Sequence, residues 1–530
     1  MAPLPTSFAV VRRRPGVRGL ALCLFVAGVA ATQVRGSMAS PAPCDDATFL
    51  RRATLDLAGR QPTPAELEAF LADGADGKRA AAVERLLADP AWAAHWARYF
   101  RDVILFRRTD DRALAMAKPL ETFLADRLRD GVGWDGIARE MITATGAPAD
   151  HGETAIIMAQ MGETSDIAAE VSRVFLGIQI QCAQCHDHFT DRWKRDQFHR
   201  YAAFFPRLAI APRQGQGLER FEVVSYDAEP RRPRGKNPDN PRRGDLEHEM
   251  PDKDDPSKPG TVMQPAFFLT AASVPLGTKD QERRGAVARA ITADDNPWFA
   301  RAIVNRLWTE LVGVGFYAGI DDLGPDREPR EADLLERLSR DFVAADHDLR
   351  ALCRAIMATP AYEAPSRSRA ARDGDPAMAS CPQRLRADQL FTQILAALDV
   401  DEAAVGGAAG RPRFGGPRGV FTQVFGYDPS LPREEIVGSI PQALALMNAE
   451  PLARALAGNR RGSPLGRLLA DHPEDDAAAD AIYVRVLARH PSPNELQTCL
   501  DHVAAAGDRA AGFEDVFWAL LNSAEFIHRR

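Results

Sequence analysis

Residues 60–67 read RQPTPAEL, and this stretch predicts the first turn of an α-helix. Thr63 takes the N-cap position, and Pro64 takes the first helical position, where its missing N–H is not needed. Glu66 follows at the third helical position, so Glu66 and Thr63 can form the two reciprocal hydrogen bonds of a capping box. We therefore expect a helix over residues 64–71.

The same pattern returns near the other end of the chain, where residues 489–496 read RHPSPNEL. Both stretches fit R-x-P-[TS]-P-x-E-L, and each is followed by a predicted helix, a turn that contains glycine, a second helix and a Leu-Leu pair. Chance similarity of two capping boxes is the alternative, and the shared residues make it the less favoured one. We expect two similar helical hairpins at opposite ends of the chain.

Most of the remaining chain also has helical signals. After Asp89, the aromatic residues Trp92, Trp96 and Tyr99 recur at helical spacing, and we expect them in the core rather than around a ligand. Aromatic residues make up only 7% of the chain, which together with abundant alanine favours helix over sheet. The other expected helices cover residues 78–87, 297–308, 334–342, 349–357, 386–398, 441–456 and 480–487.

The character of the sequence changes between residues 208 and 270. Residues 208–210 and 221–224 predict short strands, whereas residues 229–260 are rich in Pro, Arg, Asp and Lys and predict a linker or surface loop. The acidic residues 252–255 lack the glycine and the distal glutamate of an EF-hand calcium loop. The predicted fold class is mainly α, with two helical domains and a small β-containing insertion or linker between them.

The first 39 residues have the parts of an export signal. Arginines at positions 12, 13, 14 and 18 form a basic region, residues 20–32 form an apolar run, and residues 37–39 offer a cleavage site with small residues. The apolar run is shorter than the ~20 residues of a membrane-spanning helix. We expect a signal peptide over residues 1–39, a periplasmic or secreted protein, and no membrane span after signal removal. An uncleaved N-terminal anchor is the alternative.

Composition and motifs exclude several classes of protein. The net charge of −7 gives no reason to expect a nucleic-acid partner. Seven cysteines in 530 residues are too few for a fold held together by disulfides. The sequence has neither the G-x-S-x-G nor the H-E-x-x-H pattern of common hydrolases. Whether the protein is an enzyme stays open.

One short segment carries a chemical signature, since residues 182–188 read CAQCHDH. Cys182, Cys185 and His186 form the C-x-x-C-H pattern of covalent haem attachment, at the end of a predicted amphipathic helix. Two thiols about one helical turn apart can each bond a vinyl group of one haem, and the next histidine can ligate its iron. We therefore expect haem c as the cofactor, and the predicted export signal favours it.

Other interpretations of this segment stay open. The two cysteines with His186 or His188 could bind zinc or another metal, although no second C-x-x-C closes a structural zinc site. They could also act as a redox dithiol or form a disulfide. The second axial ligand of a haem iron is not fixed, with His188 and His199 as candidates; Met158 and Met161 precede the motif and lack the usual spacing.

Several other polar residues receive structural interpretations. His95 lies among aromatic residues and is expected in the core, whereas His151, His248 and His347 are expected to stand alone on the surface. Charged residues near the motif could contact His186 or haem propionates, or could be exposed charges at a helix end: Asp187, Asp191 and Arg192. A further polar cluster is expected to form a buried hydrogen-bond network rather than a catalytic site: Asn305, Arg306, Trp308, Asp321 and Asp322.

Two regions resemble a pair of bacterial domains. Residues from about 45 to 207 resemble the planctomycete-type cytochrome-like domain of unknown function 1549, through the stretches DATFLRR, LDLAGRQPTP, HWARY, EVSRVFLG and the C-x-x-C-H segment. Residues from about 284 to 528 resemble its usual companion, the domain of unknown function 1553, through NPWFAR, VNRLW, DDLG, PQAL, LMN and LNSAEF. Residues 208–270 separate the two.

The resemblance implies haem at Cys182, Cys185 and His186, but no established reaction. Many relatives carry an extra N-terminal cytochrome domain that this sequence lacks, so any redox partner is expected to be a separate protein. A neighbouring exported protein of sulfatase-like type is the other partner that the resemblance implies. Two functions follow: an exported, electron-transferring cytochrome-like protein, or a non-redox structural or partner-binding protein whose Cys and His residues hold a metal or a disulfide.

Overall fold

The computed structural model describes residues 42–107, 111–189, 191–215, 220–227, 246–255, 257–366, 382–402, 416–431 and 462–529, together with residues 436, 438, 439, 442 and 458. Helices make up 59% and strands 5%, so the prediction of a mainly α fold is confirmed. Residues 41–530 form one compact unit. The predicted signal peptide and nearly all of the helix expected at 441–456 lie outside the described residues.

The first part of the described chain is helical up to the C-x-x-C-H segment and one helix beyond it. Two of its elements, η2 and η3, are single 3₁₀ turns. The elements are α1 (Asp46–Ala58), α2 (Pro64–Ala72), α3 (Lys78–Ala88), α4 (Pro90–Leu105), α5 (Asp111–Arg129), α6 (Trp134–Thr143), η2 (Gly152–Thr154), α7 (Ala155–Ala159), α8 (Thr164–Leu176), η3 (Gln181–Gln184) and α9 (Arg195–Ala202).

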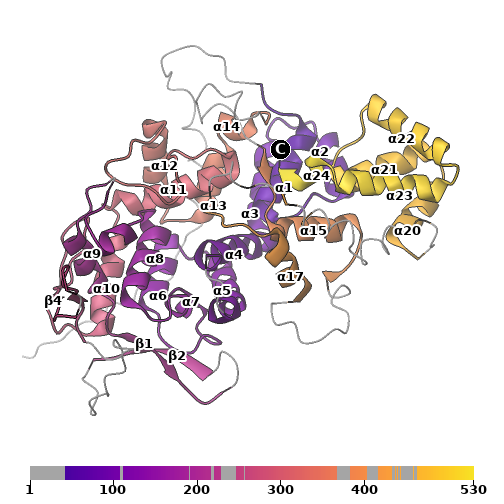
Figure 1. The fold of residues 1–530 in the computed structure, drawn as a ribbon. Helices are drawn as coiled ribbons and strands as arrows, with labels where there is room; N and C mark the ends of the chain where they lie inside the picture. The colour runs from indigo at the N-terminus through magenta and orange to yellow at the C-terminus, as the bar shows by residue number, and fades with distance from the viewer. Residues whose placement is uncertain are drawn as a thin grey trace, which may run out of the picture. The chain divides into compact units, whose positions relative to one another are not determined.

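Short strands follow where the sequence predicted them. β1 (Leu208–Pro212) pairs antiparallel with β2 (Phe221–Ser225), with Ile210 opposite Val223. β3 (Glu249–Met250) pairs antiparallel with β4 (Thr261–Val262). In Figure 1 the β1–β2 pair lies next to α6 and α7, and an isolated bridge joins Val223 of β2 to Gly146, which follows α6.

Helices dominate again after the strands, and the described residues end in a two-residue strand. No described helix is long and apolar enough to cross a membrane. The elements are α10 (Asp280–Ile291), α11 (Pro297–Val312), α12 (Ala332–Ala344), α13 (Leu349–Met357), α14 (Pro360–Glu363), β5 (Gln383–Arg384), α15 (Ala387–Ala397), α17 (Gly416–Phe425), α20 (Pro464–Asp471), α21 (Asp475–Leu487), α22 (Pro493–Ala506), α23 (Arg509–Leu521), α24 (Ala524–Ile527) and β6 (His528–Arg529).

The two predicted capping boxes are present at the starts of α2 and α22. In each box the hydroxyl of the N-cap residue, Thr63 or Ser492, accepts from the backbone N–H of the glutamate at the third helical position. The same glutamate pairs with the arginine that opens the motif, at 2.7 Å in both copies (Arg60 and Arg489). The repeated sequence pattern therefore produces the same local structure twice.

The buried apolar side chains form two clusters. The larger one draws on residues between Cys44 and Tyr362 together with Val484, and it includes the predicted aromatic residues of α4. The smaller one draws on residues between Leu385 and Phe526 together with Leu55 of α1. Burying one large aliphatic side chain contributes roughly 1.5–3 kcal/mol, so each cluster is large enough to dominate its region. α1 packs into both clusters, because it is buried nearly all round.

The two ends of the described chain are joined through α1. Arg529 of β6 donates from Nε to both carboxylate oxygens of Asp56, at 2.7 and 2.9 Å, and Tyr362 donates its hydroxyl to the same carboxylate. Arg51 donates to the backbone oxygen of Glu525 at 2.9 Å. Figure 1 shows the yellow α24 beside the indigo α1. The last residues are therefore part of the core structure.

The sequence predicted a buried His95 and an exposed His347, and the structure confirms only the first. His95 is buried on α4 as expected. The prediction that His347 lies on the surface is wrong, because only 4% of it is exposed. Its backbone takes a left-handed φ of 57° after α12, which turns its ring inward between Phe299 and Phe342. His151 is exposed as expected, but it does not stand alone, because its Nδ1 lies 3.0 Å from a carboxylate oxygen of Glu153.

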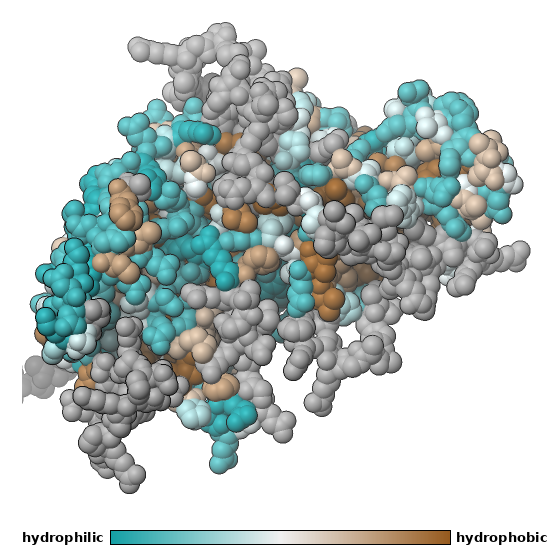
Figure 2. Space-filling view, viewed as in Figure 1, coloured by the Kyte–Doolittle hydropathy of each residue, from teal (hydrophilic) through white to brown (hydrophobic). Residues whose placement is uncertain are grey.

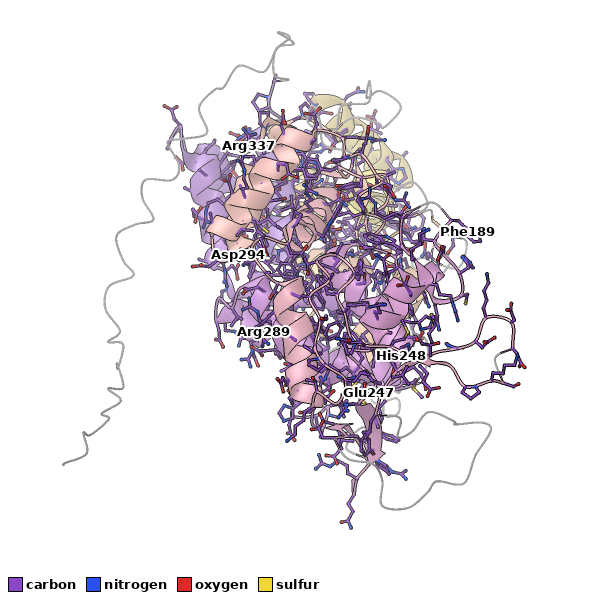
Figure 3. All side chains as sticks on the ribbon, turned by 90° about the vertical axis from the view of Figure 1, so that its left-hand side faces the viewer. Phe189, Glu247, His248, Arg289, Asp294 and Arg337 are labelled. Carbon is purple, nitrogen blue, oxygen red and sulfur yellow. The ribbon has the colours of Figure 1, made fainter. Side chains whose placement is uncertain are left out.

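Large apolar side chains are exposed at only a few described positions. Figure 2 shows a mostly hydrophilic face with hydrophobic surface over α17, a helix that exposes Val420 and Val424. The most exposed of these side chains is Phe189, at 83%. Phe189 follows the C-x-x-C-H segment by three residues, and Figure 3 shows it projecting from the molecule.

Candidate functional site

The helix that leads to the C-x-x-C-H segment ends at a glycine. Gly177 has a left-handed φ of 66°, its N–H bonds the backbone oxygen of Arg173, and the next N–H, of Ile178, bonds that of Ser172. The bond from Gly177 to Arg173 is that of an αL C-cap, which satisfies a carbonyl group at the end of the helix. The chain thus leaves α8 at a fixed point and reaches η3 after four residues.

The 3₁₀ turn η3 presents the two cysteines to solvent. In a 3₁₀ turn the residues i and i+3 lie on the same side, which applies to Cys182 and to Cys185 at the end of the turn. Both are exposed and both are free thiols. Ala183 between them is fully buried, and its N–H bonds the backbone oxygen of Ile180. The turn therefore anchors itself through Ala183 and presents its thiols outward.

His186 is oriented by its own backbone and by an exposed aromatic ring. Its Nδ1 lies 2.7 Å from the backbone oxygen of Asp187, and its ring centroid lies 4.1 Å from that of Phe189. A carbonyl oxygen can only accept, so Nδ1 carries the hydrogen and Nε2 carries the lone pair. Metal-binding histidines usually have this arrangement, in which one nitrogen donates to a carbonyl and the other faces the metal.

Asp187 ties the segment to the start of α9. Its carboxylate accepts from the backbone N–H of Arg195 and from the ammonium group of Lys194, each at 3.1 Å. The hydrogen bond from Arg195, followed by that from Lys194, lowers the pKa of Asp187. The carboxylate therefore stays ionised at neutral pH and closes the loop between η3 and α9, rather than contacting His186.

His199 lies beneath the turn instead of beside its exposed face. It lies on α9 and is only 2% exposed, and its Nε2 lies 3.0 Å from the backbone oxygen of Gln184. Its Nδ1 lies 2.9 Å from Nε2 of His248. The prediction that His248 stands alone is therefore wrong, because the β3–β4 pairing brings its segment against α9.

A loop from the C-terminal half closes another side of the segment. The N–H of Leu323 bonds the backbone oxygen of Gly177 at 2.8 Å, and Arg192 pairs with Asp326 at 2.5 Å. Burial raises the pKa of Asp191, and the nearby carboxylate of Asp326 adds to this shift. The charged residues after the motif are therefore largely committed to protein contacts.

The same loop is anchored by the polar cluster that the sequence predicted. Asp321 accepts from Arg173 of α8 at 2.7 Å and also pairs with Arg306 of α11, and all three side chains are buried. Asn305 donates to the backbone oxygen of Ile320 at 3.2 Å. The predicted network is confirmed for Asn305, Arg306 and Asp321, and it links α8 and α11 to the loop that supports the candidate site. Trp308 is buried without a hydrogen bond from Nε1 to any described residue, and Asp322 is half-exposed and pairs with Arg327 at 2.8 Å, so these two lie outside the network.

A closed site for a bare metal ion is not formed in the described part of the chain. No three His, Cys, Asp or Glu side chains converge there in a geometry that could hold a metal ion. His188 follows the motif, and its backbone N–H bonds the backbone oxygen of Trp193 at 2.8 Å. The segment thus combines two exposed thiols and an oriented imidazole without a surrounding cage.

Sequence reasoning missed two contributors to this site. His248 comes from the loop expected to be a linker, and no local periodicity singles it out. Phe189 lies three residues after His186, and an aromatic residue within a charged loop is the sequence signal that indicates it. The loop of residues 321–327 was recognised only as a polar cluster, since its contact with Gly177 is long-range.

Two protein families match consecutive parts of the chain. Residues 27–209 match the family described as protein of unknown function (DUF1549), PSCyt2. Residues 283–418 match the family described as protein of unknown function (DUF1553), PSD1. The chain therefore contains a DUF1549 domain followed by a DUF1553 domain. No curated protein and no solved structure matches the chain.

The family matches confirm the resemblance over residues 27–209 and 283–418, whereas the stretches PQAL, LMN and LNSAEF lie beyond the second match. The DUF1549 domain supplies α8, the C-x-x-C-H turn and α9. The DUF1553 domain supplies the loop of residues 321–327. His248 belongs to the segment between the two matched ranges. The candidate site is thus built by three regions of the chain.

Proposed function

We propose that this protein is an exported cytochrome-like protein in which Cys182 and Cys185 hold haem c through two thioether bonds. His186 would ligate the haem iron. The observation that carries the proposal is how the turn is presented: both thiols are exposed, while the residue between them is buried. The short name of the first family, PSCyt2, agrees with a cytochrome-like domain. Haem bound there would supply one-electron transfer.

The residues of the turn have the chemical groups that the attachment of haem c needs. Thioether formation needs free thiols that a haem can approach, and both thiols are free and exposed. Iron ligation needs a nitrogen lone pair, and the bond from Nδ1 of His186 to the Asp187 carbonyl leaves that lone pair on Nε2. Phe189 offers an exposed apolar ring beside His186, where an apolar macrocycle gains by excluding water.

Haem bound at the turn would take a second ligand from outside the turn or would keep an open position, because His188 lies only two residues after His186 and is poorly placed to supply it. Both ring nitrogens of His199 already have partners, and its side chain is buried beneath the turn. We therefore leave His199 out of the proposed ligand set. His188 lies on the same loop as His186 and is partly exposed. An open position on a haem iron also serves electron transfer or ligand binding.

Export and partners follow from the same proposal. The basic region and apolar run in residues 1–39 support export, and c-type haem requires attachment outside the bacterial cytoplasm. The electron partner is a separate redox protein or a neighbouring exported protein. Fractionation tests the location: the full chain accumulates outside the cytoplasm, whereas replacing the four arginines at positions 12, 13, 14 and 18 by glutamine causes retention of the precursor.

A second candidate is a non-redox structural or partner-binding role. The backbone of the turn is held by a buried histidine, Asp187 and the DUF1553 loop, so it is ordered without a bound group. An ordered pair of thiols beside His186 and His188 is also suited to a soft metal such as zinc, or to a disulfide. Metal content and thiol titration of a haem-free protein distinguish this role from the first.

Intact mass measurement tests the haem proposal. The full chain is exported in a bacterial host that matures c-type cytochromes, next to Cys182→Ala/Cys185→Ala and to Cys499→Ala, which removes a buried thiol elsewhere. We expect wild type and Cys499→Ala to gain the mass of one haem, and the double variant to gain none. A wild-type protein without added mass, from cells that mature their own cytochrome, would contradict the proposal.

A further inference from the structure

Two histidines form a hydrogen-bonded pair directly behind the C-x-x-C-H turn. Nδ1 of His199 and Nε2 of His248 are 2.9 Å apart, and the two rings stack at 22° with centroids 5.2 Å apart. Nε2 of His199 lies 3.0 Å from the backbone oxygen of Gln184, the residue before Cys185. The pair thus connects the peptide next to one haem-anchoring cysteine to a segment more than sixty residues later in the sequence.

The direction of these hydrogen bonds follows from their partners. The backbone oxygen of Gln184 can only accept, so His199 donates from Nε2. A neutral His199 then has its lone pair on Nδ1, and His248 must donate to it from Nε2. The Gln184 carbonyl and an N–H donated by His248 therefore favour the same tautomer of His199, with its hydrogen on Nε2.

His248 is itself held in place by its neighbour Glu247. The carboxylate of Glu247 accepts from Arg207 and Arg283, each at 2.9 Å, and from the backbone N–H of Gly277. Both arginines are buried, one in the DUF1549 domain and one on α10 of the DUF1553 domain. Figure 3 shows Glu247 and His248 next to each other. The position of His248 is thus set by both domains rather than by a free loop.

A second contact joins the same two segments. Arg195 donates to the backbone oxygen of Pro251 at 2.7 Å and approaches the backbone oxygen of Gln184 at 3.4 Å. The carbonyl of Gln184 therefore receives donors from His199 and Arg195, both of which also contact the segment from Glu247 to Pro251.

We propose that His199 and His248 are a positioning pair that sets the geometry of the Cys182–Cys185 turn for haem attachment. The haem part of this inference rests on the proposed function. Attachment joins two sulfur atoms and one imidazole nitrogen to a single rigid ring, so small displacements of the turn matter. The segment between the two family matches thereby has a role, because it contains His248, which orients the buried imidazole of His199 in the DUF1549 domain.

The test compares His248→Leu, which cannot donate, with His248→Gln, whose amide can donate to Nδ1 of His199. His502→Leu is the matched control, because His502 is an exposed histidine on α22. The full chains are produced without haem, and the rates at which iodoacetamide alkylates Cys182 and Cys185 are measured by peptide mass spectrometry. The midpoint of thermal unfolding is measured for each protein.

Loss of the pair is expected to change the ratio of the two alkylation rates in His248→Leu by roughly two- to tenfold, the range for one lost hydrogen bond. His248→Gln is expected to restore the wild-type ratio, while the unfolding midpoint of each variant stays near that of His502→Leu. In the exporting host, haem per folded chain is expected to fall in His248→Leu and to recover in His248→Gln.

Two results would contradict the proposed positioning role of His199 and His248. In the first, His248→Leu gives the same alkylation ratio as His502→Leu. In the second, His248→Leu and His248→Gln show the same change in the alkylation ratio and the same fall in the unfolding midpoint. That result would mean that His248 only stabilises the fold. A wild-type protein without haem would instead contradict the proposed function, and the alkylation ratios would still decide whether the pair positions the turn.

Discussion

Asp56 shows how single charged residues hold this fold together. It is fully buried on α1, where it accepts from Arg529 and Tyr362. Burial raises the pKa of Asp56 in spite of the opposing effect of Arg529, so the cost of removing the carboxylate from water exceeds what the arginine returns. Such a pair adds little net stability, yet each partner depends on the other.

Asp56→Leu is expected to lower the free energy of unfolding by about 3–5 kcal/mol, because it leaves Arg529 buried without its carboxylate. Adding Arg529→Met to this variant is expected to recover part of the loss, since both charges are then absent. Urea denaturation of the wild type, both single variants and the double variant measures the coupling. Asp501→Ala, at an exposed position on α22, is the control. Additive losses in the double variant would contradict this account.

At the scale of elements, the two hairpins show what short-range sequence information can determine. Thr63, Pro64 and Glu66 are within four residues of each other, and so are Ser492, Pro493 and Glu495. Their contacts are therefore fixed by the helix itself, and the prediction was confirmed in detail. His490, in the second motif, also contacts Glu68 of α2 at 3.2 Å, which brings the two hairpins together and which no local pattern predicts.

Acid is expected to weaken both hairpins in one pH range. Hydrogen bonds from Arg60 and Arg489 lower the pKa of Glu66 and of Glu495 to about 2. Since an unpaired glutamate has a pKa near 4.3, the stabilisation is complete above that pH and is lost as the pH falls toward 2. Urea denaturation at several pH values measures this: Glu66→Gln/Glu495→Gln should be less stable at pH 7 and should depend less on pH between 4.3 and 2. An unchanged pH dependence in the double variant would refute the assignment.

At the scale of the whole molecule, contacts between distant parts of the chain could not be predicted from the sequence. Helical periodicity and caps predicted many of the helices, among them α2, α4 and α11, because these signals lie within a few residues of each other. The helices α5 and α6 were not predicted, and the C-x-x-C-H segment was recognised directly from its residues. The partnership of His199 with His248 and the contact of Arg192 with Asp326 join residues far apart in the chain, and a single sequence does not state which distant surfaces meet. The burial of His347 was missed for a similar reason, since Phe299, which covers one side of its ring, comes from the distant helix α11.

The division of the core predicts how fragments behave. The larger cluster combines residues of both family matches, so a fragment of residues 42–209 loses much of its buried surface. A fragment of residues 42–366 keeps that cluster except Val484. We expect a cooperative thermal transition for 42–366, below that of the full chain because Arg529 is missing, and none for 42–209. Circular dichroism during heating measures both, and a cooperative 42–209 fragment as stable as the full chain would contradict the shared core.

The central claim is that Cys182 and Cys185 hold haem covalently, and the reduced pyridine haemochrome spectrum tests it most directly. The protein is exported in a host that matures c-type cytochromes, denatured, and compared with Cys182→Ala/Cys185→Ala. We predict a c-type band that remains with the denatured wild-type protein and is missing from the double variant. A colourless wild-type protein, or a band that persists in the double variant, would contradict the claim.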